Sequence, residues 1–258
     1  MFSARVTLLH VVEPAASGFD LMVRPVLEVE ADHELAARAR LDSYLETELP
    51  PSDAERILLV GDAATRIAAV AKERNFGLIV MPTHAGAFRR TLLGSTTAKV
   101  LNDADCPVLT TQHAETISPR SLEHREWLCA VGQQEDSERV FRYASQMARA
   151  VHANLTLVHA IPTLERDLPR EQVLNERMKT AEKEAAYRRI EDLQRAVGSK
   201  VRVAVVTGPI RDALVEAAKR LRADVLLIGR SSQTGAIGRM RDLTYAMVRD
   251  APCPVLSI

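Results

Sequence analysis

Short runs of apolar residues recur along the chain and alternate with segments that mix polar and apolar residues at helical spacing. Apolar runs without in–out alternation are typical of strands buried on both faces, as in a parallel sheet. We therefore expect strands at Val6–Val12, Arg56–Val60, Leu78–Met81, Pro107–Thr110, Trp127–Val131, Leu155–Ile161, Val201–Val206, Val225–Ile228 and Pro254–Ile258. The mixed segments predict helices at Asp32–Glu48, Ala63–Glu73, Ala98–Leu101, Ser137–Ala150, Glu171–Val197 and Ile210–Arg220. This alternation predicts a doubly wound α/β fold with right-handed crossovers.

Two stretches of the chain repeat one plan. The segment Ala4–Val12 recurs as Ala153–Ile161, and Ala104–Leu109 recurs as Ala251–Leu256. Because the elements between these anchors follow the same order, the chain is predicted to be a tandem duplication of a whole domain. The expected organisation is a first domain at 1–112, a linker at 113–124 and a second domain at 125–258.

The two copies differ at their beginnings. Before Ala153 the second copy has a strand, Glu126–Val131, and a helix, Glu135–Val151, whereas almost nothing precedes Ala4 in the first copy. The first domain is therefore predicted to lack its opening strand and helix. We expect a truncated start; the alternatives are direct pairing of the remaining strands, or a strand and helix supplied by a partner chain.

Composition narrows the functional classes. The 34 Lys and Arg residues balance the 34 Asp and Glu residues, so no net field attracts nucleic acid or an acidic membrane surface. No apolar run approaches the length of a membrane span, and no signal peptide is visible. Cys106, Cys129 and Cys253 show no metal-ligand spacing, so we expect small buried hydrophobes, no metal site and a reducing, cytoplasmic setting.

The loop after the strand Leu78–Met81 carries the most informative polar motif. Gly94 allows close backbone approach, and Ser95 or Thr96 can cap a helix whose free amides point toward an anion. This pattern predicts a phosphate cradle; the alternative is that Gly94-Ser95 only turns the chain and caps the helix. Arg89 and Arg90 are candidates for pairing with phosphate, although arginines on surface loops are usually solvated.

The segments Leu8–Val12, Thr83–Ser95 and Ala104–Leu109 together resemble the universal stress protein family in its tandem form, over nearly the whole chain. The resemblance implies α/β architecture with two doubly wound parallel-sheet domains, of the adenine-nucleotide alpha-hydrolase-like type, with strand order 3-2-1-4-5. In ATP-binding members, two glycines and a later Gly-Ser or Gly-Thr surround the phosphates and ribose. An aspartate ends the first strand, and a valine, here Val11, borders adenine.

The first copy departs from that nucleotide-binding pattern. Pro82 and Ala85 replace the two glycines, for which Gly86 is a partial substitute, and the strand that would carry the aspartate is missing. The resemblance leaves these cofactor-binding candidates in the first domain: Val11, Thr83, His84, Gly86, Arg89, Arg90, Gly94, Ser95 and Thr96.

The second copy departs from it at other positions. Gly132 stands in place of the aspartate, and Ser232 in place of the second glycine. Asp242 occupies the position of the Gly-Ser pair, where a carboxylate at a helix start would cap the helix and repel phosphate. Arg239 and Arg241 are weaker phosphate candidates than Arg89 and Arg90. We expect the second domain to bind no triphosphate.

Three functions follow from this pattern. The first is a cytoplasmic stress-response protein that acts through binding, with nucleotide binding weakened or lost. The resemblance also implies pairing of the final strands, Cys106–Thr110 and Cys253–Ile258, between the two domains of one chain, with a homodimer as the alternative. The second is ATP binding with slow hydrolysis in the first domain. The third is an enzyme, but the sequence holds no Walker loop, nucleophile elbow or zinc motif and so offers no catalytic residue. His10 and His159 are expected to be buried and hydrogen-bonded rather than catalytic bases.

Overall fold

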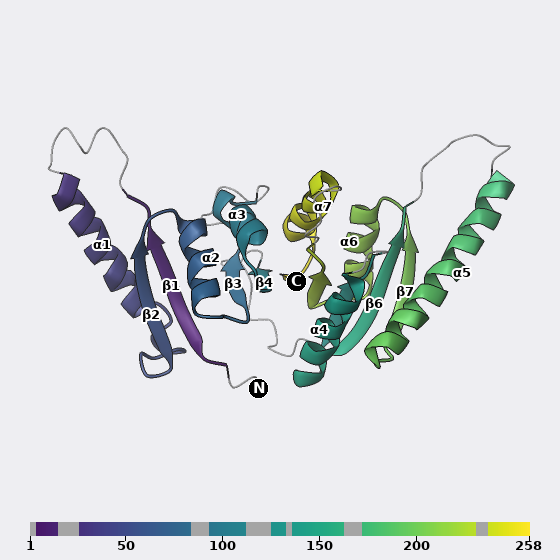
Figure 1. Ribbon diagram of the computed structural model, residues 1–258, viewed down its shortest axis with the longest axis horizontal. Coiled ribbons are helices and arrows are strands. Elements are labelled where there is room, and N and C mark those ends of the chain that lie inside the picture. The colour runs from purple at the N-terminus through teal and green to yellow at the C-terminus, as the bar shows by residue number, and fades with distance from the viewer. Residues whose placement is uncertain are drawn as a thin grey trace. The chain divides into compact units, whose positions relative to one another are not determined.

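The computed structural model describes residues 4–14, 26–83, 93–111, 125–132, 136–162, 172–230 and 237–258 (Figure 1). They form two compact units: the larger contains Leu78–Gly94 and Pro107–Ile258, and the smaller contains Phe2–Gly77 and Ser95–Cys106. In both, parallel strands alternate with helices, as the hydrophobic pattern predicts. The first sequence repeat therefore contributes to both units. The predicted linker, 113–124, lies outside the described residues.

The larger unit is built on a seven-stranded sheet with the order β3-β4-β9-β8-β5-β6-β7. Its strands are β3 (Ile79–Pro82), β4 (Val108–Thr111), β5 (Glu126–Ala130), β6 (Asn154–Ile161), β7 (Arg202–Thr207), β8 (Val225–Ile228) and β9 (Val255–Ser257). All neighbours are parallel except β4 and β9. The second repeat thus has the strand order 3-2-1-4-5 that the family resemblance implies.

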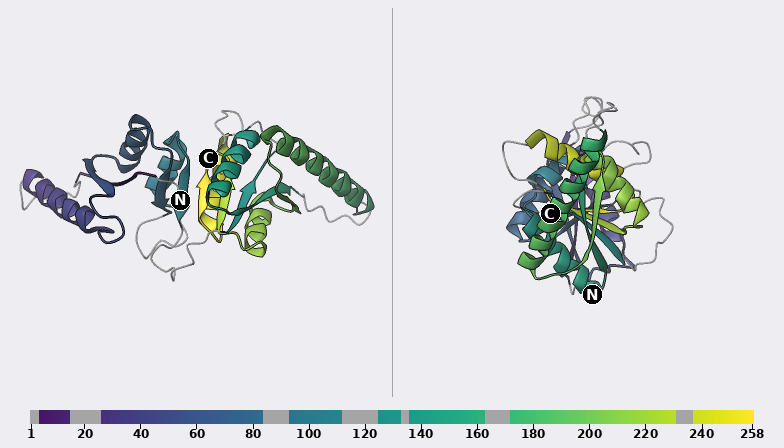
Figure 2. Two further views of the ribbon diagram at one scale, coloured as in Figure 1. Left: turned by 90° about the horizontal axis from the view of Figure 1, so that it is seen from below. Right: turned by 90° about the vertical axis from the view of Figure 1, so that its right-hand side faces the viewer.

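Helices cover both faces of this sheet. Figure 2 shows α4 (Ser137–Ala150) and α5 (Gln172–Val197) on one face and α6 (Ile210–Arg220) on the other, where α6 also contacts α7 (Ile237–Asp250). The core lies between α4 and the central strands, with Phe141, Cys129, Leu157 and Leu227 fully buried. Where its side chains are described, α5, expected at Glu171–Val197, is mostly exposed, but Ile190 is buried in this core.

The smaller unit contains β1 (Val6–Val12), α1 (Val26–Ser43), β2 (Ala54–Val60), α2 (Ala63–Glu73) and α3 (Ser95–Asp103). Strands β1 and β2 form a parallel two-stranded sheet of their own, which α1 and α2 contact. Strand β3 belongs to the larger unit, so the alternative in which β1 pairs directly with β3 stays a prediction.

The repeated strands β1 and β6 differ in burial. Leu157 and Val158 of β6 are fully buried, whereas their counterparts in β1, Leu8 and Leu9, are only half-buried. In the larger unit β5 pairs with the outer edge of β6. No strand among the described residues pairs with the corresponding edge of β1.

Antiparallel pairing of the two final strands joins the repeats within the larger unit. Val108 faces Ser257 and Thr110 faces Val255 across β4 and β9. The buried hydroxyls tighten this ladder, because Thr110 Oγ1 donates to the Val255 carbonyl at 3.1 Å and Ser257 Oγ donates to the Val108 carbonyl at 3.2 Å. The predicted pairing of Cys106–Thr110 with Cys253–Ile258 is confirmed.

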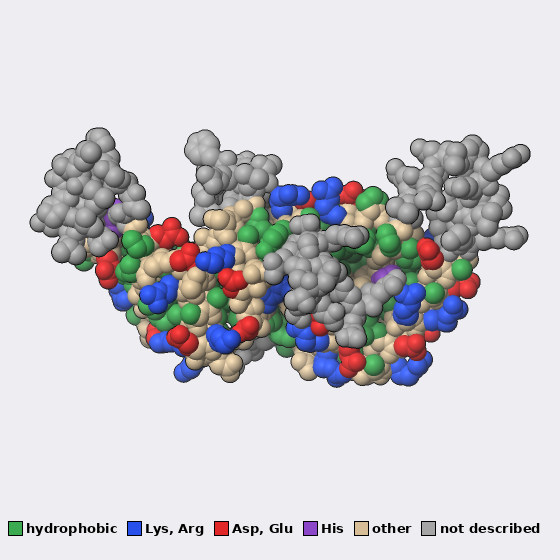
Figure 3. All heavy atoms as spheres, turned by 45° about the horizontal axis from the view of Figure 1, so that its top comes forward, with side chains coloured by type: hydrophobic (Ala, Val, Ile, Leu, Met, Phe, Trp, Pro, Cys, Tyr) green, Lys and Arg blue, Asp and Glu red, His purple; other side chains and the backbone are tan. Residues whose placement is uncertain are grey.

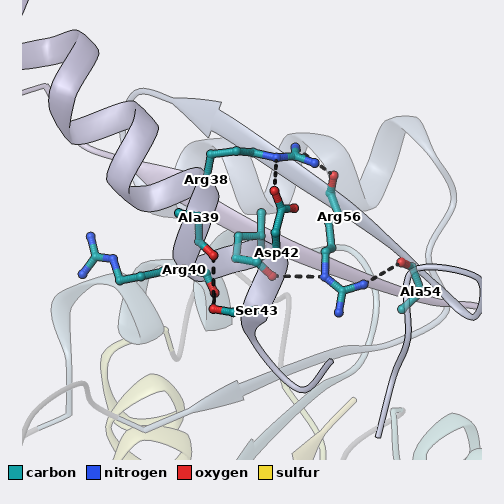
Figure 4. Close-up of polar contacts among 8 residues, drawn as sticks. Arg38, Ala39, Arg40, Asp42, Ser43, Ala54 and Arg56 are labelled. Carbon is teal, nitrogen blue, oxygen red and sulfur yellow. Dashed lines mark hydrogen bonds and ion pairs between the residues drawn. The ribbon is translucent and has the colours of Figure 1, made fainter. Parts of the chain in front are cut away.

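In the smaller unit, Arg56 of β2 holds the end of α1 (Figure 4). Its guanidinium donates to the carbonyls of Leu41, Tyr44, Leu49 and Ala54 at 3.1, 3.1, 2.8 and 3.2 Å. Carbonyls at a helix C-terminus have no intrahelical partner, so one planar cation satisfies several of them at once.

A second polar cluster links α2 to α3. Asp62 caps α2 by accepting from the Thr65 amide at 2.8 Å, and Lys99 Nζ of α3 donates to the same carboxylate at 2.8 Å and to Thr65 Oγ1 at 3.0 Å. The hydrogen bond from Lys99 lowers the pKa of Asp62 well below its usual value, and the carboxylate raises the pKa of Lys99.

Two expectations about individual elements need correction. Helix α1 spans Val26–Ser43 instead of Asp32–Glu48, because Leu45 adopts a left-handed conformation, with φ of 49°, that ends the helix. Cys129 and Cys253 are buried as expected, but Cys106 is only half-buried. Among the described residues, no helix has both the length and the apolar character needed to cross a membrane.

Replacing Arg56 by Ala should lower the free energy of unfolding by about 2 kcal/mol, because several buried or half-buried carbonyls lose their donor. Arg56→Lys should recover only part of this, since an ammonium cannot span the same set of carbonyls. Arg38→Ala is the matched control: in exposed positions Arg38 pairs with Asp42 at 3.0 Å and donates to the Arg56 carbonyl at 3.5 Å, and its replacement should cost less than about 1 kcal/mol. Thermal and urea unfolding measure the three variants; equal losses for Arg38→Ala and Arg56→Ala would contradict the assignment.

Replacing Thr110 by Val should lower the free energy of unfolding of the larger unit by about 1 kcal/mol, because a buried hydrogen bond between β4 and β9 is lost without a change of volume. Thr111→Val at the half-buried end of β4 is the control and should change the unfolding midpoint little. Urea denaturation of the full chain checks this, and a loss from Thr111→Val as large as that from Thr110→Val would refute the role of the hydroxyl.

The interaction between Asp62 and Lys99 should depend on pH. A carboxyl whose pKa is lowered by folding contributes stability above its unfolded pKa, near pH 4, and loses it as the pH falls through the folded value. A double-mutant cycle with Asp62→Asn and Lys99→Met should therefore show coupling at neutral pH that declines in acid. The more exposed Lys72–Asp105 pair, with a separation of 3.0 Å, is the control and should couple more weakly. Equal coupling in the two cycles at neutral pH would disprove a special role for Asp62.

Candidate functional site

The base of the predicted phosphate loop is closed by backbone hydrogen bonds at Thr83, directly after β3. The Thr83 amide donates to the Thr111 carbonyl at 3.0 Å, and its hydroxyl reaches the same oxygen at 3.3 Å. The Gly94 amide donates to the Thr83 carbonyl at 3.0 Å. The structure thus brings Thr83 and Gly94 together, but in a turn that already uses the Gly94 amide.

Helix α3 begins at Ser95, as the Gly94-Ser95 motif predicts. Ser95 is exposed, Thr96 is half-buried, and the first turn carries no acidic residue. The amides and dipole at such a helix start favour an anion. The local geometry of α3 is therefore compatible with phosphate even though the neighbouring Gly94 amide is engaged.

The remaining candidates divide into two groups. Val11 lies near the end of β1 and is half-buried, in the smaller unit with Ser95 and Thr96. His84, Gly86, Arg89 and Arg90 lie outside the described residues, so their predicted roles toward a nucleotide stay predictions.

Sequence reasoning missed a cation of α3 that is held by the cap of α2. Lys99 lies in the second turn of α3, and its ammonium is engaged by Asp62 and Thr65. The spacing of Asp62 and Thr65 after a short strand is a recognisable helix-capping signal. Lys99, which binds that cap from 37 residues away in sequence, could not be predicted from the residues around it.

In the second repeat, the helix after β8 starts earlier than predicted. Helix α7 begins at Ile237, so Asp242 lies inside the helix and not at its start. The expectation that Asp242 caps the helix is therefore wrong. Arg241, at the position equivalent to Gly94, continues the helix because it lacks the conformational freedom of glycine. Backbone amides at Arg241 and Asp242 belong to the helix interior, where they are paired along the helix.

The end of β5, where an aspartate would stand, is closed by polar contacts. Gly132 is exposed, and its carbonyl accepts from Ser137 Oγ at 3.2 Å. Gly229, after β8, is also tightly placed, because a Cβ there would lie 3.0 Å from Val140 Cγ2. Ser232 lies outside the described residues, as do the side chains of Arg239 and Arg241.

The two repeated histidines have different surroundings. His159 is buried, and its Nδ1 lies 2.8 Å from the Val131 carbonyl; because a carbonyl only accepts, this ring nitrogen carries the proton. The prediction for His159 is confirmed. His10 is exposed, so the corresponding prediction is wrong. The cause is that β5, which supplies the carbonyl to His159, has no counterpart beside β1 among the described residues.

Comparison with known proteins agrees with this architecture. The universal stress protein family model matches residues 1–112 and 124–258. No curated protein matches the chain. A universal stress protein structure from Archaeoglobus fulgidus DSM 4304 is 19% identical, with a TM-score of 0.65 over 97% of this chain and 84% of its own. A structure titled as a putative universal stress protein from Pseudomonas aeruginosa UCBPP-PA14 is 20% identical, with a TM-score of 0.61 over 99% and 93%.

One matched structure is that of a universal stress protein in complex with cAMP, which is 26% identical over 51% of this chain and 96% of its own, with a TM-score of 0.39. The fold is established by the two full-length matches, and the family by a sequence model that matches both repeats. The chain belongs to the universal stress protein family, with two such domains in tandem.

Proposed function

We propose that this protein acts in the stress response by binding a partner, without catalysis and with nucleotide binding weakened or lost in both domains. One observation carries the proposal: backbone amides at the two expected phosphate loops already donate hydrogen bonds within the protein. In the first domain the Gly94 amide donates to the Thr83 carbonyl, and in the second Arg241 and Asp242 lie within α7. In the first domain a phosphate would have to displace the hydrogen bond between the Gly94 amide and the Thr83 carbonyl. In the second domain no helix begins at Asp242, so no free amides are available to a phosphate there.

The sequence departures from ATP-binding members support the same proposal. Pro82 and Ala85 in the first domain, and Gly132 in the second, remove two glycines and an aspartate from the nucleotide-binding pattern.

The charge distribution favours a partner that is neither nucleic acid nor membrane. The chain has a formal net charge of zero. On the face drawn in Figure 3, acidic and basic side chains are interspersed among the described residues. Binding to a polyanion needs a basic surface of one sign, so a protein partner in the cytoplasm is the proposal that fits.

The second candidate is ATP binding at the first domain, with slow hydrolysis. It is favoured by α3, which starts at Ser95 and has no acidic residue in its first turn. Arg89, Arg90 and the other loop candidates would complete this site, with ATP as the cofactor.

Titration calorimetry of the full chain with ATP and magnesium separates the two candidates. We expect no saturable heat at about 1 mM ATP, where an intact nucleotide site would bind with at least 4 kcal/mol. Saturable binding that Gly94→Asp abolishes would overturn the proposal and establish the ATP site. Arg241→Asp changes the equivalent position of the second repeat and is the matched control, expected to have no effect on any ATP binding in the first domain.

A further inference from the structure

The two repeats differ in net charge, although the chain as a whole is neutral. Residues 1–112 contain 11 basic and 15 acidic side chains, whereas residues 125–258 contain 22 basic and 17 acidic side chains. Both repeats match the same family model. The fold itself therefore does not require this difference in charge.

Much of the difference lies at one surface of each unit, where the parallel strands begin and the helices end (Figure 1). Parallel strands start at a common edge of the sheet, and each connecting helix runs back toward that edge. In the smaller unit this surface includes the segment between α1 and β2 and the end of α2. In the larger unit it includes the segment between α5 and β7 and the end of α6. These are equivalent parts of the two repeats.

In the smaller unit, this surface is acidic. Among the described residues, four of its exposed carboxylates make no ion pair and form what we call the acidic surface: Glu46, Glu48, Asp53 and Glu73. Arg74 binds Glu55 at 2.6 Å and so joins the end of α2 to the start of β2, beside Glu73 and Asp53. Glu73 is the last residue of α2, where the helix dipole favours a cation. Its negative charge therefore does not stabilise its own helix.

In the larger unit, the equivalent surface is basic. Five of its exposed cations make no ion pair within the described part of the chain and form what we call the basic surface: Arg149, Lys200, Lys219, Arg220 and Arg222. Arg222 has a φ of 50°, and its counterpart Asn75 has a φ of 53°. Glycine and asparagine adopt this left-handed conformation at lower cost than arginine does. The backbone therefore does not explain the cation at this position.

Three equivalent positions have charges of opposite sign in the two units. The Gly61 amide donates to the Val12 carbonyl and the Gly208 amide to the Ile161 carbonyl, which aligns β2 and α2 with β7 and α6. The aligned pairs, all exposed, are Asp53 with Lys200, Glu55 with Arg202 and Glu73 with Arg220. The acidic and basic surfaces thus present opposite charges from the same positions of the same fold.

The basic surface suits a protein better than a polyanion, because carboxylates are interspersed in it. Glu126 begins β5 and pairs with Arg202 at 2.8 Å, and Asp224 directly precedes β8. The acidic surface is mixed in the same way, since Lys72 and Arg74 are neighbours of Glu73. Nucleic acid favours a continuous stretch of cations, whereas two mixed surfaces of opposite net charge complement each other.

We propose that the basic surface of one chain binds the acidic surface of a second copy of this chain. Each chain carries both surfaces, so it offers a copy of itself a site of complementary charge. An individual exposed ion pair contributes little, so several form together and the association is weak and sensitive to salt. The inference goes beyond the proposed function, because it holds whether or not either domain binds a nucleotide.

Sedimentation velocity of the full chain tests the contact. We expect a mass-average sedimentation coefficient that rises with protein concentration at about 20 mM NaCl and depends much less on concentration at about 300 mM, because salt screens the charges. Absence of any concentration dependence at low salt would overturn the proposal. A salt-dependent change of shape at constant mass would place the contact within one chain and would overturn it as well.

Exchange of equivalent residues tests the two surfaces. In one variant Asp53→Lys and Glu73→Arg give the smaller unit the residues of the larger one, and in the other Lys200→Asp and Arg220→Glu do the reverse. Each variant alone should weaken self-association at least about tenfold, because its two surfaces then carry the same sign. An equimolar mixture of the two should associate as the wild type does, since each surface again meets one of opposite sign. Thermal unfolding verifies that both variants fold, and a mixture that stays dissociated would refute the contact.

Two control variants separate this contact from a general effect of net charge. Glu34→Lys with Glu182→Lys changes the net charge as the first variant does, at exposed positions of α1 and α5. Lys183→Glu with Arg189→Glu matches the second variant at exposed positions of α5. Neither control should weaken self-association more than about twofold. Weakening as large as in the surface variants would show that net charge alone governs association and would contradict the proposal.

A labelled single-stranded oligonucleotide tests the other class of occupant. Suppose that it binds a chain that shows no self-association at low salt, and that Lys200→Asp with Arg220→Glu abolishes this binding. The basic surface would then serve a polyanion, and the proposal would be overturned. ATP calorimetry is a separate measurement, so failure of the contact between copies is distinguishable from failure of the proposed loss of nucleotide binding.

Discussion

Backbone pairing on both sides of a buried parallel strand is the constraint on which the rest of this structure depends. A buried amide or carbonyl without a partner costs about 1–3 kcal/mol, so a central strand needs neighbours on each side. Strand β5 meets this need between β6 and β8, and the residues around it form a buried core. Strand β1 has β2 on one side only among the described residues, and its side chains remain more exposed. The same repeated sequence thus produces two degrees of burial according to its neighbours.

The sequence predicted those features that depend on local pattern or on comparison of the two repeats. The apolar runs located the strands of both copies, and the family resemblance predicted that the two final strands pair, as β4 and β9 do. The exposure of His10 was not predictable in the same way, because its apolar neighbours in sequence are those of a buried strand. Burial at that position depends on whether a neighbouring strand covers it, and the residues next to it in sequence do not contain this information.

The candidate site shows the same limit. Gly94-Ser95 correctly located the start of α3, because glycine and serine have strong local preferences at a helix boundary. Asp242 was expected to mark a boundary by the same reasoning, but α7 begins at Ile237. Nothing at Arg241 stops a helix, so the helix continues through the position where glycine ends it in the first repeat. Amides that are available to an anion at a helix start are internal hydrogen-bond donors five residues into a longer helix.

In the first repeat, charged residues make polar contacts at positions where the second repeat has uncharged residues. The positions of Arg56, Asp62 and Lys99 correspond to Val203, Pro209 and Ala246. In the larger unit Val203 packs against an extensive apolar core, whereas Arg56 in the smaller unit binds the carbonyls at the end of α1. A two-stranded sheet buries little apolar surface, and small cores contribute correspondingly little stability. Hydrogen bonds that join α1 to β2, and α2 to α3, therefore help to hold the helices of such a unit in place.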